Sequence, residues 1–135
     1  MKASAAVLPK AVWLLAAVYF AASLAHFVHN AEYIAFYPGM PAWLTREQVY
    51  LAWLGITAVG MLALVSLRLG RHALGVALVG AYGAAFGLDG LAHYTLALCS
   101  EHTLATNLTI WSEALTGLLL LLVCAVLFVR RVQRG

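Results

Sequence analysis

The stretch ALGVALVGAYGAAFGLDGLAHYTLAL, residues 73–98, decides the fold of this chain. It is apolar along almost its whole length and exceeds the roughly 20 residues that a helix needs to cross a bilayer. Glycines recur in it at spacings of three and four, and it carries one aspartate and one histidine, Asp89 and His93. We therefore predict a membrane-spanning helix that packs closely on a neighbour and holds ionisable groups within the membrane.

The composition of the whole chain leads to the same class of protein. Hydrophobic residues make up 64% of the sequence and charged residues 10%, and the mean hydropathy is +0.92, values outside the range of a soluble domain. Four apolar runs have spanning length, namely residues 11–36, 48–69, 73–98 and 104–129. We predict an all-α, polytopic membrane protein, a four-transmembrane-helix bundle that forms a single domain over residues 1–135.

The basic residues indicate how the bundle is oriented. Seven of the eight precede the first run, separate the second from the third, or follow the fourth: Lys2, Lys10, Arg68, Arg71, Arg130, Arg131 and Arg134. By the positive-inside rule this side is cytoplasmic, so both termini should be cytoplasmic. In a bacterium the chain would lie in the inner membrane. Contact with anionic lipid headgroups then explains the pI of 9.1 without any nucleic-acid partner.

The five acids and four of the five histidines gather in the opposite, outer half of the bundle, and only His72 lies with the arginines. Ionisable side chains inside a spanning helix cost a few kcal/mol and usually face the bundle interior. With a rise of about 1.5 Å per residue, His26, Asp89 and Glu113 should share one depth, about 15 Å below the outer ends of their helices. His29 and His93 should lie about one turn above them. This half would face the periplasm.

Polar side chains also recur at helical spacing on three of the four runs. The stripes are Tyr19, Ser23, His26, Asn30 and Tyr33; Tyr82, Phe86, Asp89 and His93; and His102, Thr106, Thr109, Glu113 and Thr116. Residues three or four apart share one face of a helix, so we expect the three stripes to converge. Unrelated interhelical hydrogen bonds would account for the threonines but not for two carboxylates at one depth.

These residue types favour a transition-metal site. Imidazole and carboxylate ligands suit zinc, copper and iron, and helices present them at spacings of three or four. The candidate ligands are His26, His29, Asp89, His93 and Glu113. Side chains expected to orient these ligands or to contact a substrate are Asn30, Tyr33, Tyr82, Thr109 and Trp111. The sequence leaves open whether such a metal is catalytic, transported or sensed.

A metal-free acid–base site for a lipophilic substrate is the alternative. Asp89 and Glu113 are the candidate catalytic groups, because a carboxylic acid beside His26 can exchange a proton with a membrane-dissolved molecule. A proton or metal-ion relay ranks third, since the inner half contains no ionisable residue between this cluster and the arginines.

Three segments carry a family resemblance: HFVHNAEYIAFY (26–37), GLDGLAHY (87–94) and NLTIWSEAL (107–115). Together with four membrane helices they resemble the EXPERA group, which includes emopamil-binding sterol isomerases. The resemblance implies a cavity between the helices, lined by His26, Asp89, Trp111 and Glu113, that acts on or holds a sterol-like lipid. This chain departs from the family pattern at Asn30, near where a first-helix carboxylate would be expected.

Glycines on the third run predict a close helix contact. Gly80, Gly83, Gly87 and Gly90 follow one face and include a small-xxx-small motif. The partner of this face is either another segment of the chain or a second copy, which would make the protein a homo-oligomer through these glycines.

The connection between the first two runs and the two cysteines carry further expectations. Thr45 followed by Gln48 has the form of a helix-capping box, and this connection should lie across the mouth of the polar cluster. Cys99 and Cys124 belong to opposite ends of the bundle, so they cannot form a disulfide within the chain.

Overall fold

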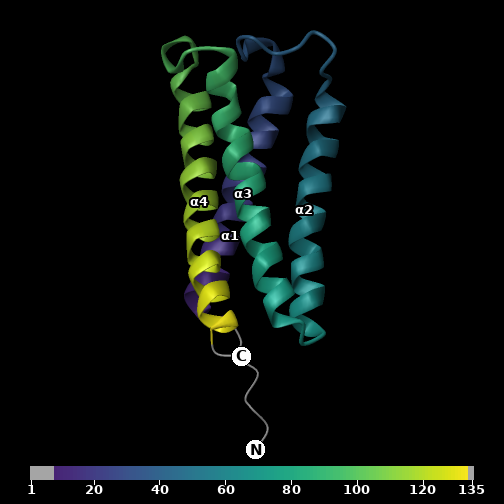
Figure 1. Ribbon diagram of the computed structural model, residues 1–135. Coiled ribbons are helices and arrows are strands. Elements are labelled where there is room, and N and C mark those ends of the chain that lie inside the picture. The colour runs from purple at the N-terminus through teal and green to yellow at the C-terminus, as the bar shows by residue number, and fades with distance from the viewer. Residues whose placement is uncertain (1–7, 134–135) are drawn as a thin grey trace, which may run out of the picture.

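The computed structural model describes residues 8–133, and within that range the chain forms four long α-helices and no strand (Figure 1). The helices are α1 (Lys10–Glu32), α2 (Arg46–Arg68), α3 (His72–Leu96) and α4 (Leu104–Val132), with short 3-10 turns η1 (Ile34–Phe36) and η2 (Cys99–Glu101). All four helices are long and apolar enough to cross a membrane. The predicted all-α membrane bundle of four helices is confirmed.

The helices run alternately up and down around a common axis. The α1–α2 and α3–α4 connections lie at one end, and the α2–α3 turn lies at the other end together with the start of α1 and the end of α4 (Figure 1). α3 packs most extensively on α4, then on α2, whereas α1 packs on α4 and less closely on α2. α1 and α3 are therefore diagonal partners across the bundle axis. Of the basic residues that indicated the orientation, Lys2 and Arg134 lie outside the described residues.

The glycine face of α3 is covered by α4. A Cβ added at Gly83 would lie 2.7 Å from the carbonyl oxygen of Gly117, and one added at Gly117 would lie 2.5 Å from the carbonyl oxygen of Gly83. Gly80, Gly87 and Gly90 also meet α4, at Cys124, Leu118 and Glu113. The sequence left open whether another segment of the chain or a second copy covers this face. In the structure, α4 of the same chain covers it.

Tyr19 connects α1 to this close helix pair. Its ring is fully buried and lies beside Gly117, where an added Cβ would come within 2.7 Å of the ring. Its hydroxyl lies 2.7 Å from the carbonyl oxygen of Tyr82 and 3.1 Å from that of Gly83, so it donates to the α3 backbone. Because Gly83 and Gly117 have no side chains, the Tyr19 hydroxyl of the diagonal helix α1 can reach carbonyl oxygens of α3.

The connection between α1 and α2 begins earlier than the sequence suggested. α1 ends at Glu32 rather than near residue 36, and the 3-10 turn η1 follows it. The predicted capping box at the start of α2 is present: Gln48 N–H donates to Thr45 Oγ1, and Thr45 N–H donates to Gln48 Oε1. Glu32 accepts from both Arg46 and Tyr50, each at 2.7 Å, which ties the end of α1 to the start of α2.

Candidate metal site

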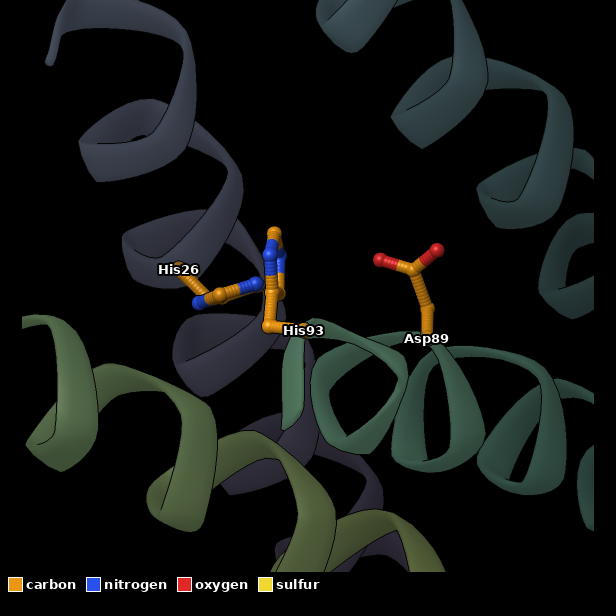
Figure 2. A group of neighbouring side chains, drawn as sticks. All are labelled: His26, Asp89 and His93. Atoms are coloured by element: carbon orange, nitrogen blue, oxygen red, sulfur yellow. The ribbon is translucent and has the colours of Figure 1, made fainter. Parts of the chain in front are cut away.

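Three ligand-type side chains from the two diagonal helices meet in the half of the bundle that carries the α1–α2 and α3–α4 connections. His26 comes from α1, and Asp89 and His93 come from α3; each offers one ligand atom, and these atoms lie within 4.8 Å of one another. In Figure 2 the two imidazole rings lie edge to face, and a carboxylate oxygen of Asp89 is directed toward them. Both histidines are buried, whereas Asp89 is partly exposed.

The hydrogen bonds of Thr109 determine which nitrogen of His26 is free. The Thr109 hydroxyl donates to the carbonyl oxygen of Thr106 at 2.9 Å, so its hydrogen is already engaged. Its oxygen lies 3.1 Å from His26 Nδ1 and must therefore accept from an Nδ1–H group. In neutral His26 the other nitrogen, Nε2, then carries the lone pair, which is the form that a metal ion requires.

Asn30 orients His93 from one turn above His26. Its amide Nδ2 lies 3.1 Å from Nε2 of His93, while the buried Oδ1 of the same amide has no hydrogen-bond partner in residues 8–133. The two ends of an amide are isosteric, so Asn30 can donate to Nε2 or, turned over, accept from an Nε2–H group. The second arrangement leaves Nδ1 of His93 free as a ligand atom.

Glu113 adjoins this group from α4. The side chain is fully buried, and Oε2 lies 3.7 Å from Nε2 of His26. Neither carboxylate oxygen, nor His26 Nε2, has a hydrogen-bond partner among the described residues. Gly90 leaves the space for this carboxylate, because a Cβ there would lie 2.8 Å from Oε2. A carboxylate oxygen and an imidazole nitrogen thus lie 3.7 Å apart, and neither has a hydrogen-bond partner in residues 8–133.

Tyr37 covers the outer side of the cluster, and the sequence reasoning did not single it out. It follows η1, is 4% exposed, and its hydroxyl lies 2.8 Å from Nδ1 of His29. Its ring centroid lies 5.1 Å from that of His93 and 6.4 Å from that of His26. Burial raises the pKa of Tyr37 to about 12, so its hydroxyl stays protonated at neutral pH. The connection between α1 and α2 therefore lies over the cluster, as its sequence predicted.

His102 is a second neighbour that was not included among the candidate ligands. Its Nδ1 donates to the carbonyl oxygen of Leu98 at 2.9 Å, which leaves a lone pair on Nε2. That nitrogen is buried and has no partner in the described part of the chain. The centroid of its ring lies 6.3 Å from that of the His93 ring and 6.5 Å from that of the Tyr37 ring. The sequence did carry a signal that His102 lies near the site, namely its position one turn before Thr106 in the polar stripe of the fourth apolar run.

Glu113, an expected ligand, lies beside the three-ligand group rather than in it, and four further expected site residues have other neighbours. His29 pairs with Tyr37 instead, and Tyr33 is 52% exposed and stacks on His29 at 4.9 Å. Trp111 is 44% exposed and lies beside Tyr94 rather than in the bundle interior. Tyr82 is buried about two turns further inward, against Tyr19 and Phe86. Of the expected orienting residues, the structure brings Asn30 and Thr109 to the ligands.

The cluster therefore consists of two imidazoles and a carboxylate with a second, fully buried carboxylate beside them. Its donors are the ones that divalent transition metals prefer, and each histidine has a neighbour that orients it. Comparison with family models, with curated proteins and with solved structures finds no match to this chain.

Proposed function

We propose that this protein is a small integral membrane protein that binds a divalent transition-metal ion at His26, Asp89 and His93. The observation that carries the proposal is the convergence of three ligand atoms, from two helices, to within 4.8 Å of one another. Two imidazoles with one carboxylate suit zinc or iron, and copper accepts the same nitrogen donors. A site with three protein ligands keeps a coordination position for water or substrate.

The geometry is close to that of a bound ion. A tetrahedral ion about 2.1 Å from each ligand atom places these atoms about 3.4 Å apart. Starting from separations of at most 4.8 Å, the side chains would need to approach one another by at most about 1.4 Å.

Charge balance supports a cation at this position. Asp89 lies beside the two imidazoles, and Glu113 is fully buried with both oxygens unpartnered in residues 8–133. Two ionised carboxylates would offset a charge of +2, whereas an isolated buried carboxylate is strongly unfavourable. A divalent ion would therefore stabilise a group of side chains that membrane insertion otherwise disfavours.

We further propose that the site faces the periplasm of a bacterial inner membrane and that both termini are cytoplasmic. The described basic residues at the helix ends, Arg46 excepted, lie at the opposite end of the bundle from the cluster. A metal-dependent enzyme acting on a lipophilic substrate is one use of such a site. Glu113 would then be its general base, 3.7 Å from a ligand nitrogen.

Elemental analysis of the detergent-purified protein, prepared without a metal-binding tag, tests the metal proposal. We expect near-stoichiometric zinc, copper or iron that is lost in His26→Ala and in His93→Ala. His29→Ala is the matched control, because His29 lies outside the three-ligand group and should leave the metal content unchanged. Folded protein without metal, or equal loss in all three variants, would overturn the assignment.

A metal-free acid–base site for a sterol-like or other lipid is a second candidate. It is favoured by one specific observation, the buried approach of Glu113 to His26 at 3.7 Å with no hydrogen bond between them. A proton held by this pair could be passed to a lipid double bond. Under this alternative the purified protein is free of metal and retains a lipid, and Glu113→Gln keeps the lipid but abolishes its conversion.

A further inference from the structure

His102 lies in the α3–α4 connection and carries a nitrogen that the three-ligand group does not use. Its chain neighbours Glu101 and Thr103 are exposed, whereas His102 itself is 7% exposed. Its Nε2 is buried and has no hydrogen-bond partner among the described residues. A buried polar atom without a partner is unfavourable, so this nitrogen calls for a ligand.

The 3-10 turn η2 holds the ring of His102 in place. The carbonyl oxygen of Leu98 accepts from Nδ1 of His102 at 2.9 Å, and the N–H of Leu98 donates to Oε2 of Glu101 at 2.6 Å. A carbonyl oxygen can only accept, so Nδ1 carries the hydrogen. In the neutral ring Nε2 then carries the lone pair, the form in which imidazole binds a metal ion.

The hydroxyl groups nearest to this ring are engaged elsewhere. The rings of Tyr37 and Tyr94 both pack against that of His102. The Tyr37 hydroxyl lies 2.8 Å from Nδ1 of His29, and the Tyr94 hydroxyl donates to Oδ1 of Asn107 at 2.7 Å. Neither of them bonds to Nε2 of His102. The lone pair is therefore available to a cation.

The spacing of the histidines favours a metal ion as that cation. The ring centroid of His93 lies 6.3 Å from that of His102 and 5.2 Å from that of His26. With metal–nitrogen distances of about 2.1 Å, two imidazoles that share an ion have centroids about 5.3 Å apart in tetrahedral geometry and about 6.5 Å apart in linear geometry. Both separations suit a shared ion. The three histidines thus form a series from the α3–α4 connection to the three-ligand group, with His93 in the middle.

We propose that His102 is a transfer ligand, which takes a divalent transition-metal ion from the side of the α3–α4 connection and passes it by way of His93 to the three-ligand group. The inference rests on the metal site proposed above. Two protein ligands hold an ion less tightly than three, so an ion shared by His102 and His93 would move on to His26 and Asp89. Because His93 belongs to both pairs, the ion keeps a protein ligand while it crosses the buried interior, where a bare ion is strongly disfavoured.

Stopped-flow uptake of Co²⁺ by the metal-free protein in detergent tests the transfer role, because Co²⁺ gains visible absorption when imidazole nitrogens replace its water. In His102→Asn the amide keeps the donor to the Leu98 oxygen but removes Nε2. We expect the rate constants for uptake and for release to EDTA to fall by the same factor, about tenfold or more, with Kd unchanged because Kd is their ratio. His29→Ala and His72→Asn are the controls and should load at the wild-type rate, since neither histidine belongs to the series.

An equilibrium titration gives a second test that does not depend on rates. His26→Ala leaves Asp89 and His93, and His102 then becomes the available third ligand, so this variant should bind Co²⁺ weakly when the ion is in excess. Adding His102→Asn should raise its Kd by about tenfold or more, the effect of one lost ligand contact. Adding His29→Ala instead should leave the Kd unchanged. Circular dichroism checks that each variant is folded.

Wild-type uptake and release rates in His102→Asn, in a protein that binds Co²⁺, would overturn the transfer role and leave the metal site intact. Slower uptake in His29→Ala would move the route to the α1–α2 connection and would also overturn it. A weaker equilibrium affinity in His102→Asn would make His102 a ligand of the resting site and contradict a role confined to transfer. A wild type that binds neither Co²⁺ nor any metal found by elemental analysis would overturn the metal site itself.

Discussion

Nε2 of His26 and Oε2 of Glu113 lie 3.7 Å apart, and both side chains are fully buried. The distance is too long for a hydrogen bond but short enough for strong electrostatic coupling. Because Thr109 accepts the hydrogen on Nδ1, the nitrogen that faces Glu113 carries a lone pair. Two acceptors that face each other in a buried site are stabilised by a cation or a proton between or beside them.

Glu113→Gln should weaken metal binding about tenfold to a hundredfold, the usual effect of losing a group that supports metal ligands. The amide has almost the shape of the carboxylate but lacks the charge that offsets the ion. Competition against a chromophoric chelator measures the affinity. Glu47→Gln is the control, because Glu47 is exposed at the start of α2 and should have no effect. Unchanged affinity in Glu113→Gln would remove this carboxylate from the charge balance.

Thr109→Val should also lower metal affinity, again by about tenfold to a hundredfold. Valine keeps the volume of threonine but cannot accept from Nδ1 of His26, so the ring loses the contact that keeps Nε2 unprotonated. Thr116→Val is a matched control on the same helix, since the Thr116 hydroxyl donates to the backbone oxygen of Ser112. The same chelator competition should separate the two variants. Equal affinities would mean that Thr109 does not set the state of His26.

Asn30→Asp should make folding more dependent on metal. An aspartate accepts from Nε2–H of His93 more strongly than an amide does, which makes Nδ1 the better ligand. The same substitution buries another negative charge, and without a cation that costs several kcal/mol. Thermal unfolding with and without metal should therefore show a lowered unfolding temperature that metal restores. Metal should raise the unfolding temperature of Asn30→Asp by more than it raises that of the wild type. An equal or smaller rise would mean that Asn30 does not act through a metal-bound His93.

The helices themselves could be predicted because they depend on local properties of the chain. Apolar length predicted four spans, and the spacing of Thr45 and Gln48 predicted the cap of α2. The tight contact between α3 and α4 followed from the glycine spacing, although the sequence did not identify the partner helix. The end of α1 was wrong by about four residues, because the 3-10 turn η1 that follows Glu32 has no distinctive sequence signal.

Which of the expected residues reach the site depends on where α1 ends and on which way each helix faces about its own axis. Tyr33 would have shared the face of His26, but α1 ends one residue before it and its side chain turns outward. Trp111 follows the buried Ile110 by one residue, a rotation of about 100°, which carries it to the outside of the bundle. Tyr37 could not be found by periodicity, since it reaches the cluster from a connection rather than from a helix.

Gly117→Leu should lower the free energy of unfolding by about 3 kcal/mol or more, because the side chain would collide with backbone that cannot move aside. A Cβ there already comes within 2.5 Å of the Gly83 carbonyl oxygen and 2.7 Å of the Tyr19 ring. Gly55→Leu is the control, because no atom lies within 4 Å of a Cβ at that position. Unfolding in mixed micelles measures both. Equal stability of the two variants would contradict the close packing of α3 on α4.

The two cysteines test the orientation of the bundle. Cys99 is exposed within the α3–α4 connection, as the first residue of η2, and Cys124 is buried near the other end of α4; neither forms a disulfide. A membrane-impermeant maleimide added to intact spheroplasts should therefore label the wild type but not Cys99→Ser. Cys124 should react only after the protein is unfolded. If Cys99 were labelled only after the membranes had been permeabilised, the α3–α4 connection and the metal cluster would lie on the cytoplasmic side. That result would contradict the orientation inferred from the basic residues.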